Sequence, residues 1–241
     1  MTYSIIKSLE DVSINLSIIS DKVSEMQREI SEILSKDVVD KKSDARILLV
    51  YSIKNSFLAC RAILRLYCFV HKSQGDSKLI AIMGCLRGLD ERSEGEENEK
   101  MLDLFLTVSL LDDIYFRIDH FFATVDKSLL SKDKSNQRFC VRITNVLTKL
   151  DIDLKEGHGF FVLSYMRNSL HNNGINRNKN GNFSINGRDF VFTKDVKVNC
   201  ASWIDIFIIL ESILLAINAI LMHPRIKAIH YIPDNFCESN K

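Results

Sequence analysis

Proline and glycine are scarce in this sequence of 241 residues, which has 2 prolines and 9 glycines. Both prolines, Pro224 and Pro233, lie near the C-terminal end. Because these two residue types are the strongest interrupters of helices, most of the chain is free to form long helices. Hydrophobic residues make up 46% of the sequence, which is enough for a sizeable core. The composition therefore predicts an all-α protein.

Several chemical signatures are also missing. The sequence has no GxGxxG, P-loop, HExxH or GxSxG pattern, so nucleotide hydrolysis, dinucleotide redox chemistry and serine hydrolysis have no support. The six cysteines form no CxxC pair and none has a histidine at zinc-finger spacing, and we expect no cofactor. Most of them lie in apolar stretches, and the first residues do not resemble a signal peptide. We therefore expect reduced thiols and a cytoplasmic location.

A charge excess of one sign is absent, since the net charge is +1. Locally the charges separate. Residues 167–197 hold six cations and two carboxylates, or +4, whereas residues 90–103 hold seven carboxylates and two cations, or −5. A basic segment favours a phosphate-bearing ligand. A solvated hairpin would have the same charges, and both interpretations stay open.

The longest apolar run, Trp203–Met222, is long enough to span a bilayer. However, Asp205, Glu211 and Asn218 interrupt it, and a charge near the middle of a membrane is costly. We therefore predict a central helix of a bundle and no membrane contact. Ser202, followed three residues later by Asp205, predicts a capping box at its start.

The remaining chain also predicts helices. Residues 5–34 form an amphipathic pattern that favours a bundle helix, with a coiled-coil or dimer arm as the alternative. Further helices are predicted over residues 45–71, 78–87, 100–130 and 137–150, and a loose tail over 231–241. The whole chain, residues 1–241, is expected to be one mostly helical domain with an N-terminal helical pair over residues 1–72.

A hairpin is predicted over Phe183–Phe192. Asn186-Gly187 is the preferred pair for a type I′ turn, and the alternating aromatic residues then share one face. That face either packs on the helices, which we favour, or stacks on exposed nucleic-acid bases.

Polar groups with chemical use gather in residues 165–174, which read Tyr-Met-Arg-Asn-Ser-Leu-His-Asn-Asn-Gly. Arg167 and His171 are four residues apart and share one helix face, with Asn168 beside Arg167. Asn-Asn-Gly then predicts the helix end. The structural interpretation is a histidine that interacts with the helix dipole and an arginine that binds a carboxylate. The functional interpretation is a general acid/base with a phosphate-binding cation.

Two other groups of polar residues are candidates for a site. Arg65 and His71 are six residues apart, which places them on different faces of a helix, and we interpret them as structural. Asp112, Asp113 and His120 suggest either a metal site or, as we favour, a salt-bridged helix face.

The predicted helix over residues 100–130 also contains Arg117 and Asp119. If that helix packs on the one that contains residues 165–174, these two side chains are candidates to support Arg167 and His171.

The Arg167-Asn168-Ser169-Leu170-His171 segment, followed by Asn-Asn-Gly, resembles the signature of the HEPN superfamily. These are all-α domains with a four-helix core, and many are metal-independent ribonucleases. The resemblance covers Gly157 to Met222, and it extends the expected core to residues 100–222 with the hairpin at 182–192. Three residues separate Arg167 from His171, fewer than the family usually has.

The resemblance implies an endoribonuclease of the toxin or phage-defence class that acts on RNA as a homodimer. His171 would act as general acid/base, Arg167 would bind the scissile phosphate, and Asn168 would position the phosphate or the imidazole. An antitoxin or effector protein would be a compatible partner. The alternative is a non-catalytic HEPN-like module that binds a protein or RNA.

Overall fold

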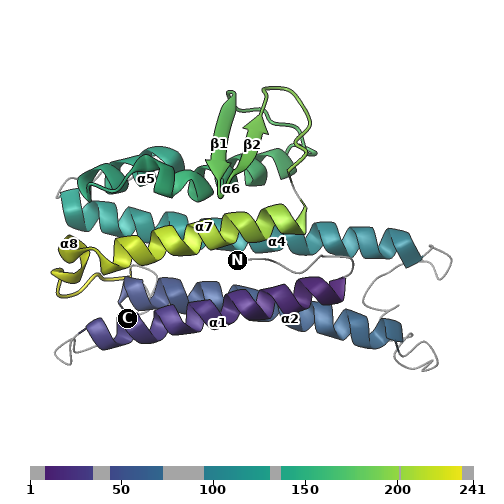
Figure 1. The fold of residues 1–241 in the computed structure, drawn as a ribbon, viewed down its shortest axis with the longest axis horizontal. Coiled ribbons are helices and arrows are strands. Elements are labelled where there is room, and N and C mark those ends of the chain that lie inside the picture. The colour runs from purple at the N-terminus through teal and green to yellow at the C-terminus, as the bar shows by residue number, and fades with distance from the viewer. Residues whose placement is uncertain (1–8, 35–43, 73–94, 131–136, 201, 235–241) are drawn as a thin grey trace.

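The computed structural model describes residues 9–34, 44–72, 95–130, 137–200 and 202–234. It is mostly helical, with one small two-stranded antiparallel sheet before the last long helix (Figure 1). The predicted helical class and the hairpin are thereby confirmed. The short helix predicted over residues 78–87 lies outside the described residues.

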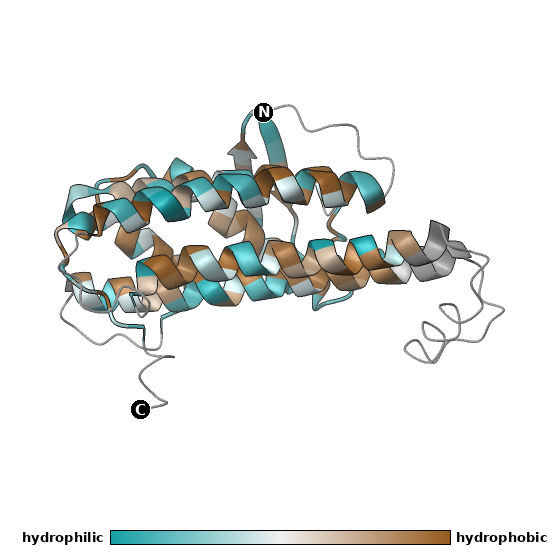
Figure 2. Cartoon of the chain, turned by 90° about the horizontal axis from the view of Figure 1, so that it is seen from below, coloured by the Kyte–Doolittle hydropathy of each residue, from teal (hydrophilic) through white to brown (hydrophobic). Residues whose placement is uncertain are grey.

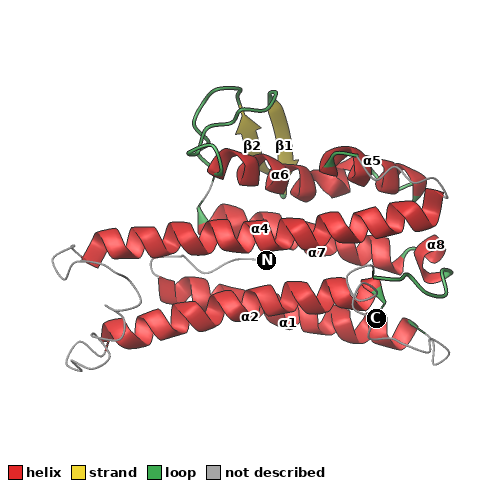
Figure 3. Ribbon diagram, turned by 180° about the vertical axis from the view of Figure 1, so that it is seen from behind, coloured by secondary structure: helices red, strands yellow, loops and turns green. Residues whose placement is uncertain are grey.

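The helices lie in layers that follow the long axis of the molecule (Figures 1 and 3). Helices α1 and α2 form one outer layer, α4 and α7 the middle, and α5, α6 and the hairpin the other side. The elements are α1 (Leu9–Ile33), α2 (Ala45–Lys72), α4 (Gly95–Leu130), α5 (Phe139–Lys149), the 3-10 helix η2 (Leu154–Gly157), α6 (His158–Leu170), β1 (Gly181–Ile185), β2 (Arg188–Phe192), α7 (Trp203–Met222) and α8 (Pro224–Lys227).

Helix α1 belongs to the bundle. Its apolar stripe is buried, with Leu16, Ile19 and Val23 fully covered, and it packs along α2 and against α7. Lys22 Nζ lies 2.5 Å from Glu211 Oε1 of α7. The stripe that suggested a coiled-coil arm is therefore covered by the same chain.

Helix α7 is buried on most of its circumference and begins with the predicted capping box between Ser202 and Asp205. By length and composition, Ala45–Phe69 and Trp203–Met222 could each cross a membrane, a test that core helices of soluble proteins also pass. Apolar residues, brown in Figure 2, occur along all the long helices, and some of them are exposed. On α2 these include Tyr51, Leu66 and Phe69.

The hairpin has the predicted turn and register. Asn186 and Gly187 have φ values of 51° and 78°, and Ile185 pairs with Arg188. Phe190 and Phe192 are buried, and the Phe192 ring lies 4.9 Å from that of Tyr165 on α6. The aromatic face thus packs on the helices, as we favoured.

A buried ion pair joins the start of α2 to the C-terminal segment. Arg46 and Asp44 are 1% and 0% exposed, and Arg46 Nη2 lies 2.6 Å from Asp44 Oδ2. Arg46 Nη1 also donates to the carbonyl oxygens of Ile226 and Ile229, each at 3.0 Å. Since Ile232 is fully buried beside this pair, the prediction of a loose tail is wrong for residues 231–234.

Candidate functional site

Helix α6 ends where the sequence predicted. Asn173 and Gly174 have φ values of 55° and 79°, the left-handed conformation that asparagine and glycine tolerate. The Gly174 N–H donates to the Ser169 carbonyl oxygen at 2.8 Å, and the His171 N–H donates to that of Arg167 at 3.2 Å. The backbone therefore fixes His171 at the last turn, next to solvent.

Asp112 of α4 joins the two principal residues of this helix end. Arg167 Nε donates to Asp112 Oδ1 at 2.8 Å. His171 Nε2 lies 2.9 Å from both Oδ1 and Oδ2 of the same carboxylate. Arg167 and His171 thus share a face of α6, as their spacing predicted, and both point at α4.

Aromatic rings hold the Arg167 guanidinium from the side of α4. Its Cζ lies 5.0 Å from the ring centre of Tyr115 and 5.3 Å from that of Phe116, within the range of a cation–π contact. Burial raises the pKa of the Tyr115 hydroxyl, Asp119 adds to the rise, and Arg167 opposes it. Tyr115 therefore stays an uncharged ring beside the cation. Among the described residues no hydrogen-bond partner is found for Arg167 Nη2.

The His171 side chain is 45% exposed, whereas those of Arg167 and Asp112 are 24% and 23% exposed. A carboxylate accepts hydrogen bonds, so Asp112 selects the tautomer with the proton on Nε2. Nδ1 is then the basic nitrogen, and within the described part of the chain no hydrogen-bond partner is found for it. The arrangement orients one imidazole nitrogen and leaves the other for proton transfer.

Asn168 and Lys197 complete the polar surroundings. Asn168 Oδ1 accepts from Arg167 Nη1 at 3.3 Å, and its carbonyl oxygen accepts from the Asn172 amide at 2.6 Å. The Lys197 stem lies against the helix end, because a β-carbon at Gly174 would be 3.8 Å from Lys197 Cε. A second cationic side chain therefore lies against Gly174, which is three residues after His171 in the sequence.

The basic segment is partly neutralised by ion pairs. Arg177 pairs with Asp195 at 2.9 Å, and Arg188 pairs with Asp205 of α7 at 2.5 Å. With Arg167 on Asp112, three of the six cations counted in residues 167–197 have a carboxylate partner. This favours the solvated-hairpin interpretation for the arginines of the hairpin region, while Lys197 remains next to the helix end.

The prediction that Arg117 and Asp119 assist the site is wrong. Arg117 Nη2 binds Asp113 at 2.9 Å, and Asp119 pairs with Arg142 of α5. Asp112 takes their role. The sequence placed Asp112 on the right helix but gave no sign of which side of that helix faces α6.

The suggested trio of Asp112, Asp113 and His120 is separated in the structure. Asp112 binds Arg167 and His171, Asp113 binds Arg117, and His120 Nε2 lies 3.1 Å from Asp234 Oδ1. These contacts form the salt-bridged helix face that we favoured. Arg65 is exposed on α2, in the layer opposite α6, and so lies apart from Arg167 and His171 (Figure 1). The His71 side chain lies outside the described side chains.

Comparison of this chain with protein-family models, with curated proteins and with solved structures found no match.

Proposed function

We propose that this protein is a metal-independent endoribonuclease of the HEPN type, of the toxin or phage-defence class. One observation supports this most: a single carboxylate, Asp112, holds Arg167 and an exposed His171 together at one helix end. The helical bundle with a hairpin before its last long helix is compatible with the same proposal.

The geometry suits proton transfer at a phosphodiester. His171 Nδ1 takes the proton of the ribose 2′-hydroxyl, and the 2′-oxygen attacks the adjacent phosphorus. The bond from phosphorus to the 5′-oxygen breaks, and the leaving oxygen takes a proton from the imidazolium of His171 in a second copy. The products are a 2′,3′-cyclic phosphate and a 5′-hydroxyl. Arg167 Nη2 stabilises the charge that develops on the phosphate, and Lys197 adds a second cation.

The exposure of His171 supports a homodimer in the proposed mechanism. A side chain that is 45% exposed at the surface is accessible to a second subunit and to RNA. Pairing two α6 ends would bring two imidazoles to one phosphate, so that one acts as base and the other as acid.

The test is cleavage of 5′-labelled RNA in EDTA by the wild type, His171→Ala and Arg167→Ala, each first shown to be folded by circular dichroism. We expect a cyclic-phosphate end from the wild type alone. His230→Ala is a matched control, because His230 is also an exposed histidine but belongs to the segment after α8 and not to the end of α6. The proposal is contradicted if the RNA stays intact in every reaction and also stays intact in phage-infected cells that express the protein.

A second function is favoured by the same contacts. Arg167 Nε and His171 Nε2 both bind Asp112, so the three side chains also tie α6 to α4. In a non-catalytic module that binds protein or RNA, this tie would be their whole role. His171→Ala would then lower the free energy of unfolding, while the wild type would bind a partner and cleave nothing.

A further inference from the structure

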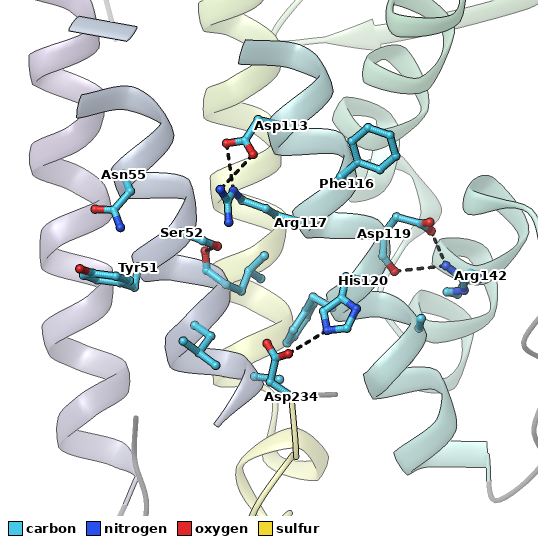
Figure 4. A pocket seen from close by; sticks show the side chains of 15 residues that line it. Tyr51, Ser52, Asn55, Asp113, Phe116, Arg117, Asp119, His120, Arg142 and Asp234 are labelled. Atoms are coloured by element: carbon cyan, nitrogen blue, oxygen red, sulfur yellow. Dashed lines mark hydrogen bonds and ion pairs between the residues drawn. The ribbon is translucent and has the colours of Figure 1, made fainter. Parts of the chain in front are cut away.

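A groove of about 770 Å³ runs between α2 and α4, beside the candidate site (Figure 4). We call it the α2–α4 groove. Its volume is within the range of sites for small ligands, about 300–1,000 Å³. Tyr51, Ser52 and Asn55 line it from α2, and Phe116, Arg117 and His120 from α4. Arg142 of α5 and Asp234 of the C-terminal segment close it at the edge.

Phe116 connects the groove to the candidate site. At 100° per residue, Phe116 projects from α4 between the direction of Asp112, which faces α6, and that of Asp113, which faces α2. Its ring centre lies 5.3 Å from Arg167 Cζ, and the same ring lines the groove. Only the Phe116 ring therefore separates a ligand that fills the groove from the Arg167 guanidinium.

Aromatic surface is exposed on both rims. Phe116 is 57% exposed and Tyr51 is 50% exposed, which is unusual for large apolar rings in a helical protein. They lie on opposite sides of the groove, with Tyr51 on α2 and Phe116 on α4 (Figure 4). Exposed rings of this kind are stacking surfaces for flat ligands.

The charges of the groove favour an uncharged ligand with hydrogen-bond donors. Asp113 pairs with Arg117, Asp119 with Arg142, and Asp234 with His120. Three carboxylates, Asp113, Asp119 and Asp234, face two guanidiniums, so the lining carries no excess of positive charge from its arginines. A phosphate is not attracted by this balance. Carboxylate oxygens accept hydrogen bonds from the exocyclic amino groups of adenine, cytosine and guanine, which uracil lacks.

We propose that the α2–α4 groove binds the nucleobase next to the phosphate that Arg167 holds, with preference for bases that have an amino group. This inference rests on the proposed ribonuclease function for the identity of the ligand. Phe116 stacks on the base at the boundary of the two sites, and the groove thereby selects which bond of the RNA reaches His171.

The test is a nuclear magnetic resonance titration of the folded protein with cytidine, adenosine and uridine, which have no phosphate. We expect cytidine and adenosine to bind and uridine to bind at least about fivefold more weakly. Phe116→Leu and Tyr51→Leu should each weaken cytidine binding by at least about fivefold, since they remove a stacking ring. His171→Ala should bind cytidine as the wild type does, because His171 does not line the groove.

Phe105→Leu is the matched control. Phe105 is on the same helix, 60% exposed, and 11 residues before Phe116, so it projects from α4 in nearly the same direction but does not line the groove. Cytidine affinity should not change in this variant, and an equal loss in Phe105→Leu would contradict the inference.

The two proposals fail separately. Nucleoside binding that depends on Tyr51 and Phe116, together with intact RNA, supports the groove and overturns the ribonuclease. RNA cleavage without binding of any nucleoside, or with equal binding of uridine, overturns the groove and leaves the ribonuclease in place.

Discussion

Asp112 and His171 are 59 residues apart in the sequence, yet His171 Nε2 lies 2.9 Å from both oxygens of the Asp112 carboxylate. The same carboxylate binds Arg167 Nε at 2.8 Å. One acidic side chain thus contacts both an imidazole and a guanidinium. These contacts can stabilise the packing of α4 on α6, and they can orient the imidazole, and the two effects can be measured separately.

A double-mutant cycle on Asp112 and Arg167 measures the structural part. Both side chains are partly exposed, so we expect a coupling of about 0.5–1 kcal/mol in the free energy of unfolding. The measurement is urea denaturation of the wild type, Asp112→Ala, Arg167→Ala and the double variant. Strictly additive losses would show that the pair does not stabilise the packing of α4 on α6.

Asp44→Ala should destabilise the protein far more. The substitution leaves the Arg46 guanidinium buried without its carboxylate, and such a loss costs about 3–5 kcal/mol. Urea denaturation checks this. The control is Arg177→Ala, which breaks an ion pair whose side chains are 56% and 55% exposed, and which we expect to cost at most about 0.5 kcal/mol. Similar losses for the two variants would contradict the role of the buried pair.

Gly159→Ala tests the contact between α6 and α7. A β-carbon at Gly159 would lie 2.9 Å from Ser212 Oγ and 3.1 Å from the Ile213 backbone nitrogen. The helices must move apart, and we expect a loss of about 1–3 kcal/mol. Because Ser212 Oγ is the nearest atom, adding Ser212→Ala should recover part of the loss. If the melting temperature of the double variant is no higher than that of Gly159→Ala, the contact with Ser212 is not the cause of the loss.

Cys60 should be almost unreactive in the folded protein. Burial raises the pKa of its thiol to about 12. At pH 8 about one thiol in ten thousand is then ionised, compared with roughly a quarter for an ordinary thiol of pKa about 8.5. Alkylation by iodoacetamide, followed by mass spectrometry, should modify Cys60 rapidly in urea and very slowly in buffer.

The same shift has a consequence for stability. The folded chain holds the Cys60 proton more tightly than the unfolded chain, so its contribution to the free energy of unfolding is constant below pH ~8.5 and declines as the pH rises from there toward 12. Cys60→Ala should flatten this decline in alkaline denaturation curves. An unchanged slope would contradict the assignment to this thiol.

Local patterns predicted the elements well. Ser202 and Asp205 gave the start of α7, Asn186-Gly187 gave the turn of the hairpin, and Asn173-Gly174 gave the end of α6. In each case two or three neighbouring residues determine the backbone, so the sequence contains the whole cause.

Relationships between distant elements were not predictable in this way. Asp112 was placed on a helix with Asp113, but which of the two faces α6 depends on how α4 packs, and packing depends on side chains throughout the bundle. For the same reason Ile232 and Asp234 looked like part of a loose tail, although Ile232 bonds to the start of α2 and Asp234 lies 3.1 Å from His120 of α4. The helical class is therefore established, while the HEPN assignment and the roles of Arg167, Asn168 and His171 remain proposals.

The Asp44–Arg46 pair also sets an order of events during synthesis. Its partners at Ile226, Ile229 and Ile232 are made about 180 residues after it. On the ribosome, the α1–α2 layer emerges early but lacks the carbonyl oxygens that satisfy the buried guanidinium. The start of α2 therefore acquires its final environment last, when the segment after α7 has emerged, and any truncation before Ile232 leaves a charged group of the first layer without its cover.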